Sequence, residues 1–184
     1  DYKASQVNEL LERPTHPQFS VEQVIQQVKP GNEYFLSADI TGAFFCHPLQ
    51  EGPEGGDLTT FLTHRGKYFF TVLPQGCRVS QDFLGTTLSE ALDHKDLKDD
   101  QDKQVIRIID DIAGCCKNLP TFKKLCKALF TRCKEYNVKL NPTKFQFSTS
   151  HINFAGVVIS KEGVTPDPER MSGLSKFPRP TTCK

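Results

Sequence analysis

Hydrophobic positions along this chain recur at two spacings, one typical of helices and one of strands. Apolar residues three and four positions apart predict three helices, at 20–29, 80–94 and 119–137. Ser20 and Gln23 form a capping-box pattern at the start of the first helix, and Ser80 is the expected cap of the second. Asn137 can end the third helix in a left-handed conformation.

Short apolar runs between turn residues predict the strands. They comprise a strand at 34–40, a hairpin at 59–73, two strands around 105–116, and a final hairpin made by 144–148 and 152–160. With the first hairpin set aside, the order is strand, helix, strand, strand, helix, strand. That order predicts an α+β fold of the ferredoxin-like, split βαβ type, an antiparallel sheet with helices on one face. The hairpin at 59–73 is then an insertion.

Composition narrows the functional classes only slightly. The 184 residues are 37% hydrophobic and 24% charged, with a net charge of +1, and no apolar run approaches the roughly 18 residues of a membrane span. None of the seven cysteines is spaced as CxxC, which favours reduced core thiols of an intracellular protein over a zinc site. Seven basic residues and one acid lie within 123–144, a segment that is either a solvated helix face or a phosphate-facing surface.

Two adjacent carboxylates, Asp110 and Asp111, interrupt a segment that is otherwise almost entirely apolar. Both flanks predict strands, so the pair marks the tip of a tight hairpin, where both side chains can face one side. Two buried carboxylates repel each other, and a divalent cation removes that penalty. Hard oxygen ligands favour magnesium or manganese. Asp39 ends the strand expected beside this hairpin, and three such acids suit two-metal phosphoryl transfer.

An aspartic protease is the first alternative, because "ADITG" faintly resembles the D-[ST]-G loop, but the inserted Ile40 breaks that motif. Five other segments occur in a fixed order, namely "LSADITGAFFCHPL", "VLPQGCRVSQDFLGTTL", "IRIIDDIAGCC", "KLNPTKFQF" and "INFAGVVISKEGVTPDPERM". In that order they resemble the motifs of the reverse transcriptases of LTR retroelements, both gypsy-type and gammaretrovirus-like. The resemblance covers essentially the whole chain and implies an RNA-directed DNA polymerase.

The resemblance also implies roles for single residues. Asp39, Asp110 and Asp111 become the catalytic acids, which bind two Mg²⁺ ions, or Mn²⁺ in their place, together with the carbonyl of Ile40. The incoming deoxynucleoside triphosphate is expected at Phe44 and Gln75. The primer and template are expected at four residues: Ile108, Phe154, Ala155 and Gly156. Ile108 stands where the family has tyrosine or another aromatic residue at the head of Y-x-D-D.

The same resemblance divides the chain into five parts. These are the end of the fingers with a connecting helix at 1–30, the first catalytic strand of the palm at 31–49, a fingers hairpin insertion at 50–78, the rest of the palm at 79–163, and a linker towards the thumb at 164–184. The expected partners are an RNA or DNA template with its primer, deoxynucleoside triphosphates, and the upstream fingers, thumb, connection and RNase H regions of a Pol polyprotein. No membrane is implied, and the location is intracellular, in a cytoplasmic particle or the nucleus.

Two further functions stay open at this point. A degenerate or domesticated element would keep the fold and some nucleic-acid binding without catalysis, and Ile108 is the residue that favours this alternative. Another palm-type nucleotidyltransferase or cyclase would share the acids, but the "LPQG" and "FAG" segments count against it.

Overall fold

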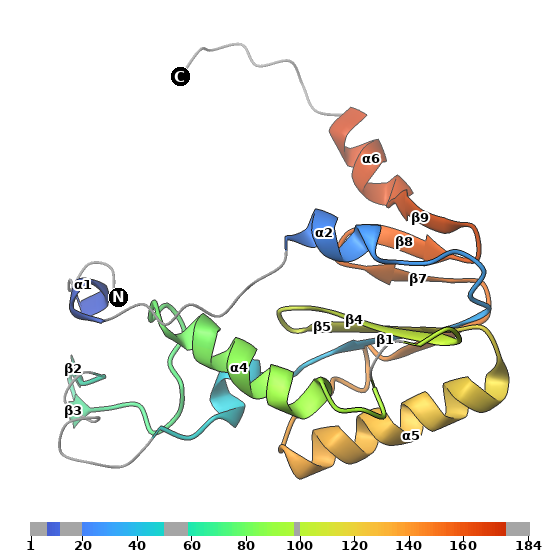
Figure 1. Ribbon diagram of the computed structural model, residues 1–184. Coiled ribbons are helices and arrows are strands. Elements are labelled where there is room, and N and C mark those ends of the chain that lie inside the picture. Colours follow the sequence, from blue (N-terminus) through green and yellow to red (C-terminus); the bar gives the residue numbers. More distant parts are fainter. Residues whose placement is uncertain (1–6, 12–19, 50–58, 98–99, 176–184) are drawn as a thin grey trace.

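Helices and strands follow one another along the chain in the order shown in Figure 1. The structure is a computed structural model that describes residues 7–11, 20–49, 59–97 and 100–175. Its helices are α1 (Val7–Leu10), α2 (Val21–Gln26), the 3-10 helix η1 (Ala43–Cys46), α4 (Ser80–Leu92), α5 (Leu119–Glu135) and α6 (Pro168–Ser175). Its strands are β1 (Tyr34–Asp39), β2 (Phe61–Thr63), β3 (Gly66–Tyr68), β4 (Lys103–Ile108), β5 (Asp111–Cys116), β6 (Gln146–Ser148), β7 (His151–Phe154), β8 (Val157–Ser160) and β9 (Gly163–Pro166).

A four-stranded antiparallel sheet with the order β4-β5-β1-β6 forms the centre of the molecule. Alternate residues of its strands pack into two separate apolar clusters, as the period-two geometry of a strand requires. Leu36 and Ile112 face the helices α4 and α5, whereas Phe35 and Ala113 face the sheet β7-β8-β9. The expected α+β class with antiparallel strands is confirmed. The sheet is covered on both faces and not only by helices.

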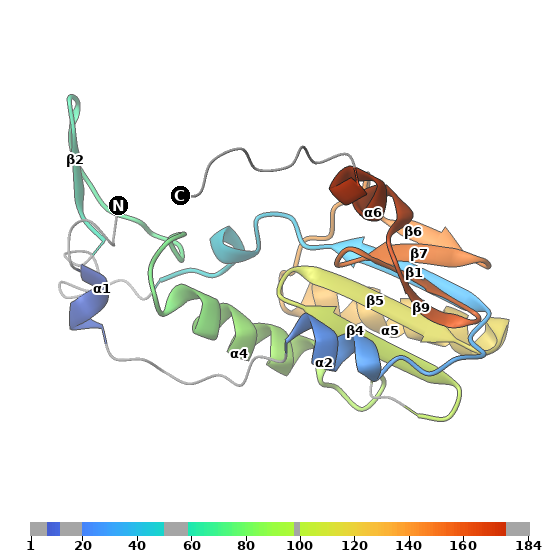
Figure 2. The same cartoon turned by 90° about the horizontal axis from the view of Figure 1, so that it is seen from above.

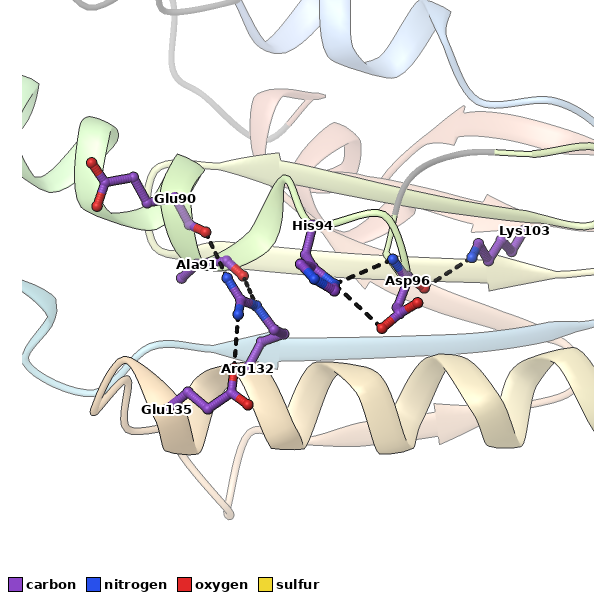
Figure 3. A network of polar contacts seen from close by, with 7 residues as sticks. All are labelled: Glu90, Ala91, His94, Asp96, Lys103, Arg132 and Glu135. Atoms are coloured by element: carbon purple, nitrogen blue, oxygen red, sulfur yellow. Dashed lines mark hydrogen bonds and ion pairs between the residues drawn. The ribbon is translucent and has the colours of Figure 1, made fainter.

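A polar network joins the end of α4 to α5 (Figure 3). The Arg132 guanidinium donates from Nε to the Ala91 carbonyl and from a terminal nitrogen to the Glu90 carbonyl, both at 2.8 Å. Its other terminal nitrogen lies 2.7 Å from Glu135 Oε2. The last carbonyls of a helix have no hydrogen-bond donors within the helix, and here the Arg132 side chain donates to two of them. This network holds the end of α4 against α5.

The helix signals in the sequence are partly confirmed. Ser20 and Gln23 make the reciprocal capping-box bonds, at 3.3 and 2.9 Å, and Asn137 has φ +53 after α5. Ser80 does not cap α4: its hydroxyl donates to the Pro74 carbonyl at 2.7 Å, and Val79 holds the cap position without a side-chain bond. The Ser80 prediction was wrong because the Pro74 carbonyl, six residues earlier in the chain, accepts the hydrogen bond from the hydroxyl.

The final hairpin also differs from its prediction. Segment 144–148 contributes β6 to the central sheet beside β1, while 152–160 folds on itself as β7 and β8, with the turn at Ala155-Gly156. A further strand, β9, follows where only a linker was expected. Residues 1–6, 12–19, 50–58, 98–99 and 176–184, which include parts of the predicted fingers and linker, lie outside the described residues. Within the described part of the chain, no helix is long and apolar enough to cross a membrane.

Candidate active site

The three aspartates singled out by the sequence come together at one end of the central sheet. Asp39, the last residue of β1, is the direct antiparallel partner of Asp111, the first residue of β5. Directly opposed side chains lie on the same face of a sheet. Asp110 is in the turn before β5, and its carbonyl accepts a hydrogen bond from the Ile40 N–H at 3.0 Å. The strand end and the turn are therefore fixed to each other through the backbone.

The turn between β4 and β5 has two residues, Ile109 and Asp110, one position earlier than the sequence indicated. Ile109 has φ +52, a left-handed conformation that a β-branched residue adopts only at a cost of roughly 1–3 kcal/mol. The tight turn starts β5 at Asp111, directly opposite Asp39. The left-handed conformation of Ile109 is therefore part of the turn that places Asp111 opposite Asp39.

Burial and mutual repulsion set the electrostatics of this site. The pKa of Asp110 is raised by burial first, and then by the charges of Asp39 and Asp111. The pKa of Asp111 is raised by burial and by Asp39, while Lys144 acts in the opposite direction. Asp110 Oδ1 is buried and has no hydrogen-bond partner within the described residues. An unpaired buried carboxylate oxygen is costly, so this site is suited to a positively charged ligand.

One basic side chain already neutralises part of the negative charge of the three aspartates. Lys144 Nζ lies 3.1 Å from Asp39 Oδ1, and the pair is partly exposed. In this arrangement no group of three or more His, Cys, Asp or Glu side chains among the described residues is positioned to hold a metal ion. The donor chemistry nevertheless fits a hard cation, because three carboxylates supply only oxygen ligands. Two of them come from the neighbouring strands β1 and β5, and the third comes from the turn before β5.

The raised carboxyl pKa values predict a pH-dependent stability for the metal-free protein. A carboxyl whose folded pKa exceeds its unfolded value stabilises the fold at low pH and loses that contribution as pH rises through the folded pKa. Asp110→Asn removes the cost of ionising this carboxyl beside two others, so we expect the variant to unfold at a higher temperature than the wild type at pH 7.5. The difference in Tm should shrink as pH falls towards about 4.

Thermal unfolding in a chelator over that pH range measures this difference. Glu90→Gln is the control, because it removes a carboxylate from an exposed position of α4. A gap between Asp110→Asn and wild type that stays constant from pH 7.5 to pH 4.5 would show that carboxylate repulsion is not its cause.

Phe44 lies five residues after Asp39, in the 3-10 helix η1. Gly42 precedes this helix with φ +58, which turns the chain sharply after β1. The Phe44 ring is partly buried against the larger apolar cluster, while the neighbouring Phe45 is 50% exposed. The structure thus gives the two adjacent phenylalanines different environments, one packed against the core and one half exposed.

Gln75 is exposed in a tight turn with Gly76, which has φ +83. Two contacts fix this turn from outside. Ser80 Oγ donates to the Pro74 carbonyl on one side, and Asn8 of α1 bonds to both ends of the loop on the other. Asn8 donates to the Gly76 carbonyl at 3.1 Å and accepts from the Arg78 N–H at 2.8 Å. The Gln75 side chain is therefore presented by a rigid backbone.

The segment Phe154–Gly156 forms the turn between β7 and β8. Phe154 is buried, and Ala155 and Gly156 have φ +48 and +84, the conformations of a two-residue hairpin turn. Phe154, Ala155 and Ile108 belong to the same apolar cluster. The head of the Asp110-Asp111 hairpin and this second turn therefore share one packed core.

Lys144 and Asn8 were not singled out by the sequence. Neither carries a motif signal, because each acts through a partner more than 60 residues away in the chain: Asp39 for Lys144 and the Gln75 turn for Asn8. Lys144 lies at the end of the basic segment 123–144, and only the fold shows that it meets a carboxylate.

Comparisons with known proteins point to one family. A family model described as "Reverse transcriptase (RNA-dependent DNA polymerase)" matches residues 2–159. The retrovirus-related Pol polyprotein from transposon 412 of Drosophila melanogaster is 28% identical over 98% of this chain. The transposon Tf2-3 polyprotein of Schizosaccharomyces pombe is 26% identical over 100% of this chain. The chain spans 14% and 13% of these two relatives.

Solved structures show the same fold. A foamy viral protease-reverse transcriptase in complex with an RNA/DNA hybrid has a TM-score of 0.84 at 18% identity, covering 98% of this chain and 23% of that one. Another foamy viral protease-reverse transcriptase, in complex with double-stranded DNA, has a TM-score of 0.85 at 19% identity, covering 98% of this chain and 30% of that one.

Proposed function

This chain belongs to the reverse transcriptase (RNA-dependent DNA polymerase) family, and from that premise we propose that it carries the polymerase catalytic centre of a retroelement Pol polyprotein. One observation supports this most strongly. Asp39 and Asp111 face each other across two strands, beside Asp110, whose buried Oδ1 has no hydrogen-bond partner in the described residues. A purely structural protein gains nothing from this arrangement, because it concentrates negative charge that Lys144 only partly compensates.

Asp39, Asp110, Asp111 and the Ile40 carbonyl would hold two divalent cations, magnesium or manganese. When bound, such ions lower the pKa of an attacking hydroxyl and neutralise charge on a leaving pyrophosphate. The chain's own part is to position the ligands. The backbone bond between Ile40 and Asp110 holds the turn against the strand end. Lys144 neutralises Asp39 while no cation is bound and must release it when one binds.

Substrate positions follow from the neighbouring elements. We assign the incoming deoxynucleoside triphosphate to Phe44 and Gln75, because η1 follows the strand that carries Asp39 and the Gln75 turn is fixed by its own contacts. We assign the primer and template to Ile108 and the Phe154–Gly156 turn, which share one apolar cluster beside the acids. An aliphatic Ile108 fills its place in that cluster, so it does not by itself indicate a degenerate site.

The architecture is consistent with this assignment. We interpret the sheet order β4-β5-β1-β6, with α4 and α5 on one face, as a ferredoxin-like palm. We interpret β2 and β3 as part of a fingers hairpin, since this hairpin stands away from the central sheet in Figure 2. The matching foamy viral structures contain an RNA/DNA hybrid and double-stranded DNA, which supports a template–primer duplex as the partner.

Primer extension tests the proposal. The chain, joined to the fingers and thumb regions of an active relative, should extend a DNA primer on an RNA template with deoxynucleotides and Mg²⁺, and should stop when EDTA is added. A matched chimaera with Asp39, Asp110 and Asp111 all changed to asparagine controls for contaminating polymerase. Extension no greater than in that control would favour a non-catalytic remnant of the family.

A further inference from the structure

Arg170 of α6 lies directly over the turn between β7 and β8. A Cβ atom placed on Gly156 would collide with its guanidinium, since Nη1, Cζ and Nε are the three nearest heavy atoms. Three atoms of one guanidinium at a single backbone position show that the group packs against the turn itself. The absence of a side chain at Gly156 makes this approach possible.

The Arg170 guanidinium has no hydrogen bond or ion pair within the described residues. The nearby acids Asp167 and Glu169 line a different surface, a groove of about 670 Å³ that also includes His151 and Glu162. Arg170 does not line that groove. A guanidinium offers five N–H donors in a planar fork that matches a phosphate, and Arg170 is exposed, so these donors are accessible to a ligand.

The location of Arg170 relative to the acids follows from strand geometry. Asp39, Asp111 and Ile108 occupy one row across β1, β5 and β4, on the face that packs against β7 and β8. Ser37, two residues before Asp39, donates to the Asn153 carbonyl of β7 at 3.4 Å. The β7–β8 turn is therefore next to the row of acids. Arg170 places its positive charge over this turn.

We propose that Arg170 is a positioning residue that binds a backbone phosphate of the primer strand where that strand crosses the β7–β8 turn. This inference rests on the proposed function, because it requires a primer beside the Phe154–Gly156 turn. Phosphate contacts fix the register of a nucleic-acid strand without reading its sequence. By fixing one phosphate, Arg170 would hold the primer end against the acids.

The test is duplex binding by the 184-residue chain, measured by fluorescence anisotropy with a labelled primer–template in EDTA over a range of NaCl concentrations. Loss of one phosphate contact should lower the slope of log K against log salt by about 0.9. Arg170→Ala should show that change and bind roughly tenfold more weakly at low salt. Arg170→Lys should keep the wild-type slope with intermediate affinity, since it keeps the charge but not the fork.

Lys117→Ala is the matched control, because it removes one exposed positive charge just after β5, at the end of that strand away from Asp111 and outside the basic segment 123–144. Thermal unfolding of each variant excludes a folding defect. An Arg170→Ala slope equal to that of wild type overturns the proposal and leaves the proposed function standing. If the wild-type chain binds no duplex, the Arg170 contact is rejected, and the primer and template assignment of the proposed function fails with it.

Discussion

Changing Asp110 to asparagine is expected to reduce nucleotidyl transfer by roughly a thousandfold in a chain that carries fingers and thumb regions. Asparagine keeps the size of the side chain but removes a negative charge and one anionic oxygen ligand. Groups that stabilise charge in the transition state are typically worth a factor of a hundred to a thousand each. Because Asp110 Oδ1 is buried and has no hydrogen-bond partner among the residues that the structure describes, the loss should be near the upper end.

Single-nucleotide incorporation on a primer–template measures this effect. Asp82→Asn, a neutralised aspartate in the first turn of α4, is the control and should retain wild-type activity. The rate should not recover at high Mg²⁺ if the ligand set is broken. An Asp110→Asn variant with more than a tenth of wild-type activity would remove Asp110 from the catalytic centre.

The second large effect concerns the choice of sugar. Phe44→Val is expected to raise incorporation of ribonucleotides relative to deoxynucleotides by roughly ten- to a hundredfold. If the incoming sugar lies beside Phe44, as we propose, the bulky ring would exclude a 2′-hydroxyl, and overpacking of this size costs roughly 1–3 kcal/mol. The smaller valine relieves that clash, whereas the deoxynucleotide, which lacks the hydroxyl, gains little.

Phe45→Val provides a matched control for this prediction. The two residues are neighbours of the same type in η1, but the Phe45 ring is half exposed whereas Phe44 packs against the core. The discrimination ratio, taken from kcat/KM for the two nucleotide classes, should move only for Phe44→Val. If both variants or neither change the ratio, Phe44 is a packing residue without a role in sugar selection.

The parts of the site that were predictable from sequence depend on local patterns. Asp39 and the Asp110-Asp111 pair each follow or begin an apolar strand, and antiparallel topology then brings them to one sheet end. The position of the turn was wrong by one residue, because the sequence does not signal that Ile109 adopts a left-handed conformation. Patterns of hydrophobicity fix the face of a strand but not the exact ends of a tight turn.

The remaining features depend on contacts, local or between distant segments, that the sequence patterns do not specify. Ser80 carries a strong capping signal, yet its hydroxyl bonds to Pro74 because the loop before α4 folds back on itself. Segment 144–148 was assigned to the wrong hairpin, since three residues of strand can pair with any available edge. Lys144 and Arg170 owe their positions to those same long-range arrangements, and a basic residue in sequence gives no indication of which carboxylate or backbone it will meet.

Titration of the 184-residue chain with Mn²⁺ by isothermal calorimetry tests most directly whether Asp39, Asp110 and Asp111 form one cation site. Binding requires neither nucleic acid nor any other region of a polyprotein, so it isolates the acids. We predict a measurable binding heat for the wild type and its loss in Asp110→Asn, with Asp82→Asn binding as the wild type does. Equal Mn²⁺ affinity in wild type and Asp110→Asn would contradict a shared metal site.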